Sequence, residues 1–118
     1  MSLDFISDYQ VQKNGNDILL GISTTSGAIL DILTSEKELF ECQRFIEDLR
    51  YPELLSVQIG RFGEFSITLN YVEWNNCNAA LFINGPDFKS GRNQSAAITI
   101  NKDELLHVIK KVLKKCRN

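Results

Sequence analysis

The sequence predicts a single α+β domain over residues 1–118, in which a mostly antiparallel, twisted sheet carries two helices. Short segments that alternate apolar and polar residues are separated by turn residues, which is typical of meandering strands. Two longer segments have helical spacing behind capping residues. The length of 118 residues and the 43% content of hydrophobic residues suffice for one core without disulfides or metals. The order of elements reads as three strands and a helix, then four strands and a helix.

The first three strands are predicted by turn residues between apolar runs. The segments "YQVQ" (9–12) and "DILLGI" (17–22) flank Asn14-Gly15, a pair that tolerates positive φ and predicts a hairpin. The run "AILDIL" (28–33) follows a turn that contains glycine and predicts the third strand. Three successive strands joined by short turns favour antiparallel neighbours.

A helix is expected over about residues 36–50. Ser35 and Glu38 have the spacing of a capping box, and Pro52 prevents the helix from continuing far beyond this range. Apolar residues recur at helical spacing and predict the face that packs on the sheet, with Phe45 beside them: Leu39, Cys42, Ile46 and Leu49.

The second half predicts four strands and a final helix. The strands are "LLSVQIG" (54–60), "FSITLNYVEW" (65–74), "AALFING" (79–85) and "SAAITI" (95–100), with "RFG" turning between the first two. Asn101 and Glu104 repeat the capping spacing and open a helix through about residue 116. Matching apolar faces predict that five residues share one core: Ile46, Ile67, Leu69, Ile98 and Ile109.

The polar stretch between the last two strands predicts a loop over residues 86–93 rather than a phosphate-binding loop. With Lys89 as the lysine of such a loop, the glycine positions hold Ile83 and Phe88, and a strand follows in place of a helix. Nucleotide binding is therefore not expected. Two interpretations of the loop remain: a solvated connection with Phe88 folded back onto the core, or a contact with a partner, for which an aromatic residue flanked by charges is common.

Several functional classes are disfavoured by composition. The three cysteines (Cys42, Cys77 and Cys116) are widely spaced and there is one histidine, so neither a zinc site nor a disulfide framework is expected. No apolar run approaches the roughly 18 residues of a membrane span, and the first residues do not read as a signal peptide. We therefore expect a cytoplasmic protein with no metal, no cofactor and no membrane contact.

Catalysis is not expected either, and no residue is assigned a catalytic role. The last helix has an apolar stripe made by Leu105, Ile109, Val112 and Cys116. The single histidine, His107, falls on the opposite side among lysines, where it is exposed and has no nucleophile beside it.

Charge is distributed unevenly along the chain. Residues 1–59 hold ten acids and four bases, a net charge of −6, whereas residues 60–118 hold nine bases and five acids, a net charge of +4. The basic last helix leaves nucleic-acid binding open as an alternative. Lysines in a last turn also complement the helix dipole, and the overall charge of −2 argues against a dedicated nucleic-acid binder.

The strand-rich block "GEFSITLNYVEWNNCNAALFING" and the acidic helix "SEKELFECQRFIEDL" resemble the immunity proteins that bacteria pair with contact-dependent growth inhibition and other polymorphic toxins. This resemblance implies a stoichiometric, non-enzymatic inhibitor that binds a cognate toxin domain, a nuclease being one class. Acidic side chains would suit such a partner because they can mimic phosphates and steer a basic protein. A small acidic secretion or adaptor chaperone is the alternative, and a monomer is favoured over a homo-oligomer.

The residues expected to contact the partner lie in two places. On the first helix an aromatic residue opposite the apolar stripe is surrounded by carboxylates: Glu36, Phe40, Glu41, Glu47 and Asp48. The second group belongs to the 86–93 loop: Asp87, Phe88, Lys89 and Arg92. The wet face of the sheet around Thr68 and Asn70 is the alternative interface.

Overall fold

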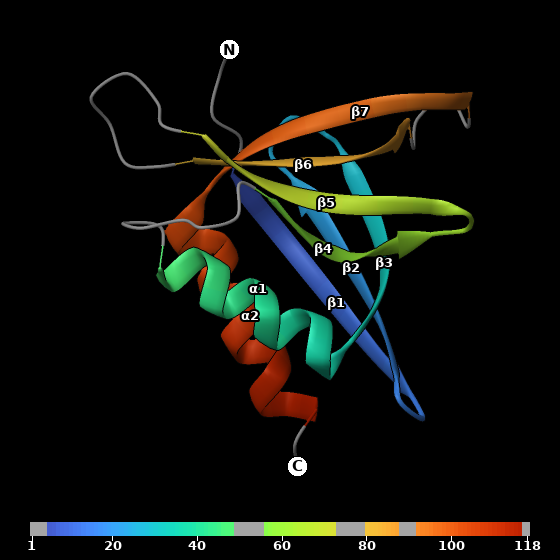
Figure 1. Ribbon diagram of the computed structural model, residues 1–118. Coiled ribbons are helices and arrows are strands. Elements are labelled where there is room, and N and C mark those ends of the chain that lie inside the picture. The colour runs from blue at the N-terminus through green and yellow to red at the C-terminus, as the bar shows by residue number, and fades with distance from the viewer. Residues whose placement is uncertain (1–4, 49–55, 73–79, 88–91, 117–118) are drawn as a thin grey trace.

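The computed structural model describes residues 5–48, 56–72, 80–87 and 92–116, which form seven strands and two helices (Figure 1). The elements are β1 (Ile6–Asn14), β2 (Asp17–Thr24), β3 (Ile29–Ser35), α1 (Glu36–Glu47), β4 (Ser56–Phe62), β5 (Phe65–Val72), β6 (Ala80–Asp87), β7 (Arg92–Asn101) and α2 (Lys102–Cys116). The strands make one sheet in the order β1 to β7, and each neighbouring pair is antiparallel. The predicted α+β class and order of elements are confirmed.

Both helices lie side by side on one face of the strongly twisted sheet (Figure 1). Alternate strand residues point toward them and are buried. The core takes Ile18, Leu20 and Ile22 from β2, Leu30 and Ile32 from β3, Leu39, Cys42 and Ile46 from α1, and Leu105, Ile109 and Val112 from α2. Of the five residues predicted to share the core, four are buried in it, and Ile98 packs against it partly buried. In the described part of the chain, neither helix has the length and apolar character that a membrane span requires.

Two hairpin turns differ slightly from the sequence prediction. Asn14 pairs with Asp17, so the first turn is Gly15-Asn16 rather than Asn14-Gly15, with Gly15 at φ 64°. Between β4 and β5, the predicted turn at residues 61–63 is wrong. β4 continues through Phe62, and a turn at Gly63-Glu64 follows, with Gly63 at φ 59°. In both cases glycine supplies the positive φ that a two-residue hairpin loop requires, so its position sets the turn.

The predicted 86–93 loop is also wrong in its extent. β6 continues through Asp87, β7 begins at Arg92, and these two residues are paired. A strand ladder is made by backbone groups, so polar residues can extend it as readily as apolar ones. Pro86 lies at an irregularity of this ladder, where the missing proline N–H is tolerated. Residues 88–91, between the strands, lie outside the described residues.

α1 begins as predicted and is shorter than predicted. The Ser35 hydroxyl accepts a hydrogen bond from the Glu38 backbone N–H at 3.3 Å, which confirms the N-cap. The helix ends at Glu47, and Asp48 forms its C-cap with a backbone N–H that donates to the Arg44 carbonyl at 3.0 Å. Residue 49, predicted to pack on the sheet, lies outside the described residues.

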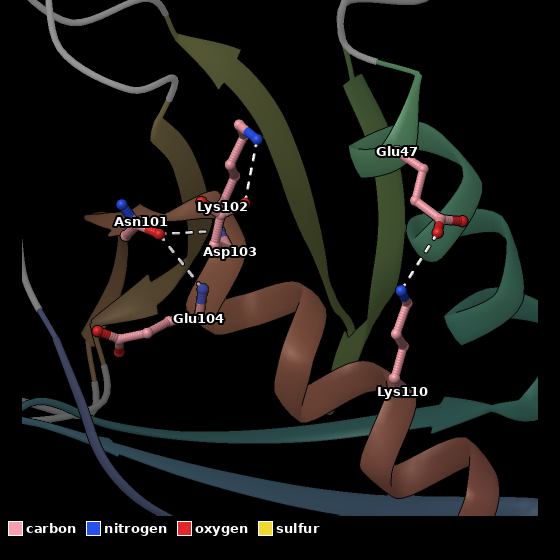
Figure 2. Close-up of polar contacts among 6 residues, drawn as sticks. All are labelled: Glu47, Asn101, Lys102, Asp103, Glu104 and Lys110. Carbon is pink, nitrogen blue, oxygen red and sulfur yellow. Dashed lines mark hydrogen bonds and ion pairs between the residues drawn. The ribbon is translucent and has the colours of Figure 1, made fainter.

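α2 is capped by Asn101, whose Oδ1 accepts from the backbone N–H groups of Asp103 at 2.8 Å and Glu104 at 3.3 Å (Figure 2). The Glu104 side chain accepts from the Ile6 backbone N–H at 2.6 Å. At the other end of the helix, the Lys13 ammonium donates to the Cys116 carbonyl at 2.9 Å. Because β1 is an edge strand, it has backbone groups without a strand partner. The bond from the Ile6 N–H satisfies such a group, and together with the bond from the Lys13 side chain it ties β1 to both ends of α2.

β3 and β4 join the two halves of the sheet at close range. Leu33 and Arg61 are in register, and the buried Thr34 hydroxyl donates to the Ile59 carbonyl at 2.6 Å. Gly60 is buried next to this contact. Its lack of a side chain allows β3 and β4 to approach closely.

Candidate functional site

α1 exposes the residues that the sequence placed on its outer face. Leu39, Cys42 and Ile46 point into the core, and the opposite side of the helix faces solvent. The exposed members of the predicted surface are Glu36, Phe40, Glu41, Glu47 and Asp48. Phe40 keeps 43% of its surface exposed, which is a large exposed area for an aromatic side chain.

The carboxylates of α1 form two groups around the helix. At about 100° per residue, Glu36 and Glu47 fall within about 40° of Phe40. Glu41 and Asp48 lie about a quarter turn further round. The exposed bases between the two groups are Lys37 and Arg44. The face is therefore of mixed charge with an excess of carboxylates, rather than uniformly acidic.

Glu47 contacts α2. Its carboxylate lies 3.4 Å from the Lys110 ammonium (Figure 2). It also accepts a hydrogen bond from the Gln43 amide at 3.2 Å. Ion pairs between exposed side chains contribute little to stability. The pair does, however, offset the charge of Glu47, which weakens its contribution to the acidic field of α1.

Glu38 is a partly buried carboxylate that sequence reasoning identified only as a capping residue. The Ser35 hydroxyl lies 3.4 Å from its Oε1, and its Oε2 is buried with no hydrogen-bond partner. Burial raises the pKa of Glu38, against the lowering effects of Ser35 and Arg61, and nearby Glu41 raises the pKa further. The sequence indicated Glu38 only through its capping spacing. Its burial could not be predicted, because it depends on neighbours outside the helix.

Replacing Glu38 by glutamine is expected to stabilise the protein more at about pH 7 than at about pH 4. A raised pKa means that the folded state binds the Glu38 proton more tightly than the unfolded chain, so this group lowers stability as the pH rises above its ordinary range. Glutamine keeps an acceptor for Ser35 and cannot ionise. The gain at neutral pH should be below about 1 kcal/mol because the carboxyl is only partly buried.

Urea unfolding of the parent and Glu38→Gln at both pH values measures this difference. Glu64→Gln removes an exposed carboxylate from a turn and is the matched control. An equal effect of Glu38→Gln at the two pH values would show that the burial of its charge is not the cause.

Cys42 and His107 lie on different helices, α1 and α2. Burial raises the pKa of the Cys42 thiol to about 12, and Glu38 and Glu41 add to the increase. The thiolate is the nucleophilic form, and its population at neutral pH is negligible for such a group. His107 is exposed, as predicted. Among the described residues, no three His, Cys, Asp or Glu side chains are grouped as a metal site would need.

The other half of the predicted surface is separate from α1. Asp87 and Arg92 lie at the paired ends of β6 and β7, and Phe88 and Lys89 lie outside the described residues. Figure 1 places this end of the hairpin well away from α1. The described part of the second group therefore lies apart from α1 (Figure 1).

Several exposed apolar side chains lie outside the contact surface that the sequence predicts. They include Leu19 (44% exposed), Ile29 (57%), Phe62 (41%) and Phe65 (38%). A signal for Leu19 was present in the run Ile18-Leu19-Leu20. In a strand, successive residues point to opposite faces, so the middle residue of three must face away from its neighbours.

Comparison of the chain with protein-family models, with curated proteins and with solved structures found no match.

Proposed function

We propose that this protein is a non-enzymatic inhibitor that binds another protein, and that it is an immunity protein neutralising a cognate toxin domain in the bacterial cytoplasm. The observation that carries the proposal is the exposed face of α1, where Phe40 is 43% exposed among charged side chains of both signs with carboxylates in excess. An aromatic side chain within a charged rim is typical of protein contacts. The ring supplies buried apolar area, and the charges remain at the solvated edge.

The charge of α1 supports a basic partner. Glu36, Glu41, Glu47 and the C-cap Asp48 outnumber the two exposed bases of α1, and the ion pair with Lys110 offsets only the charge of Glu47. A nuclease domain is one suitable toxin class, because it must be basic where it binds the phosphates of its substrate. Carboxylates that occupy phosphate positions would attract such a domain and cover the surface it uses.

Reversing the charge of Glu41 and Asp48 to lysine is expected to slow association with the toxin domain by about tenfold at low salt. The effect should shrink at high salt, because rim carboxylates act mainly by steering the encounter. Phe40→Ala should leave association nearly unchanged and speed dissociation by about tenfold or more, since a buried aromatic anchor slows departure. Phe88→Ala should likewise speed dissociation if the predicted loop between β6 and β7 contacts the toxin domain. The measurement is surface-based kinetics with the cognate toxin domain.

The control is a variant that carries Glu64→Lys and Asp103→Lys, which changes net charge equally at exposed positions outside α1. Equal slowing by both charge reversals would assign steering to total charge and not to α1. If every variant binds like the parent, the interface lies elsewhere. If the parent neither binds the toxin domain nor protects cells that express it, the proposed function is wrong.

A further inference from the structure

The face of the sheet opposite the helices carries exposed apolar side chains. Ile18, Leu20 and Ile22 of β2 are buried, so the residues between them point away from the helices. On that side, Leu19 is 44% exposed and Ile29 of β3 is 57% exposed. Both helices lie on the other face (Figure 1), and the described residues leave these two side chains accessible.

The strand register brings these residues into one surface. Leu19 pairs with the half-buried Leu33, and Ser23 pairs with Ile29. Residues paired across antiparallel strands project from the same face. Between these pairs Gly21 lies opposite Asp31, and a side chain at Gly21 would come within 3.4 Å of Asp31 Oδ1. The Asp31 carboxylate is therefore next to the bare glycine, between the apolar side chains.

Carboxylates outnumber bases around this surface, where Arg61 of β4 is an exposed base paired with Leu33. Asp8 pairs with Ser23, and Asp17 precedes the buried Ile18, so both project to the outer face together with Asp31. Lys13 is the one base in the sequence of β1–β3, and it pairs with Ile18 on the helix side, where it donates to the carbonyl of Cys116. We call this surface the outer face of β1–β3, and it consists of Asp8, Asp17, Leu19, Ile29, Asp31 and Leu33.

We propose that the outer face of β1–β3 is a second docking surface, which binds a basic, amphipathic segment of a protein partner. Covering Leu19 and Ile29 removes apolar area from water, and the hydrocarbon stems of lysine or arginine can pack there while their charges reach the carboxylates. A second copy of the chain does not fit, because a twofold contact through this face would bring its carboxylates together.

This inference rests on the proposed function in one respect, namely that the chain works by binding protein. It concerns a different site, since the outer face and α1 lie on opposite sides of the sheet (Figure 1). A single compact domain docked on α1 would leave the outer face accessible. The second surface therefore suits another segment of the same partner.

The test uses a synthetic amphipathic helix of leucine and lysine, about four turns long, added to the isotopically labelled full chain. We expect the peptide to change the NMR chemical shifts of backbone amides mainly on β2 and β3, around Leu19 and Ile29. The same peptide with glutamate in place of lysine should bind at least about tenfold more weakly, because the carboxylates repel it. Shifts concentrated on α1, or equal binding of the two peptides, would overturn the inference.

Variants separate this site from a general charge effect. Leu19→Lys combined with Ile29→Lys should weaken peptide binding by about tenfold or more, whereas Phe65→Lys, at a similarly exposed position of β5, should not. Asp17→Asn with Asp31→Asn preserves side-chain shape and should weaken binding mainly at low salt. If the Leu19→Lys/Ile29→Lys variant and the Asp17→Asn/Asp31→Asn variant both bind the peptide like the parent, the inference is overturned, whether or not the toxin domain binds. If the toxin domain does not bind the parent but the peptide still maps to the outer face, the proposed function alone fails.

Discussion

Replacing Gly60 by alanine is expected to destabilise the protein by about 3 kcal/mol. A side-chain carbon at Gly60 would lie 2.5 Å from Ile32 Cγ2 and 2.5 Å from the Leu33 carbonyl oxygen. The Leu33 oxygen is a backbone atom and cannot rotate away, so β3 and β4 would have to separate. That movement would also strain the hydrogen bond from Thr34 to the Ile59 carbonyl. Equilibrium unfolding in urea measures the loss.

Gly21→Ala is the matched control because Gly21 also lies within a strand of the same sheet. Its nearest contact would be Asp31 Oδ1 at 3.4 Å, the end of an exposed side chain that can move. We expect its free energy of unfolding to stay within about 0.5 kcal/mol of the parent. A similar small change for Gly60→Ala would show that β3 and β4 do not approach closely at this point.

Truncating Leu69 to alanine is expected to lower the free energy of unfolding by about 2–5 kcal/mol. Leu69 is fully buried in β5, and it pairs with Val57 on one side and with the buried Ile83 on the other. Removing its side chain takes away buried apolar area and leaves a cavity that the surrounding strands can fill only partly. The same urea unfolding experiment measures this change.

Leu19→Ala applies the same truncation to an exposed strand position and should change stability by about 0.5 kcal/mol or less. Leu19 is 44% exposed on the opposite face of the sheet, so little buried area is lost. A loss below about 0.5 kcal/mol for Leu69→Ala would mean that β5 presents its other face to the core.

Local patterns in the sequence were sufficient for the order of elements and for most of the core. The spacing of Ser35 and Glu38 located the start of α1, and Asn101 located the start of α2. These signals act within one helical turn, so the residues that carry them are neighbours in the chain. Alternation in β5 likewise identified Ile67 and Leu69 as inward-facing. The limits of the hairpins were less accurate, because backbone pairing extends strands through polar residues such as Asp87.

The candidate site was predictable only in part. The exposure of Phe40 and its neighbouring carboxylates followed from the helical period, because the apolar stripe leaves one possible outer face. The position of α1 relative to Asp87 and Arg92 could not be predicted from the helical period or from any other local pattern. Those two groups are on different elements, and the twist and order of the whole sheet set the distance between them (Figure 1).

The sequence by itself determined the α+β class, the order of strands and helices, and the faces that α1 and α2 bury, because these depend on residues a few positions apart. The tertiary structure alone decided which distant groups meet. Glu104 reaches the backbone of Ile6 across 98 positions of sequence, and Glu47 meets Lys110 on the other helix. It also decided that Gly60 lies against β3 and that Leu19 and Ile29 share the outer face with Asp31. The physical reason is that register, twist and helix packing set these contacts through the whole core, and no short stretch of sequence encodes them.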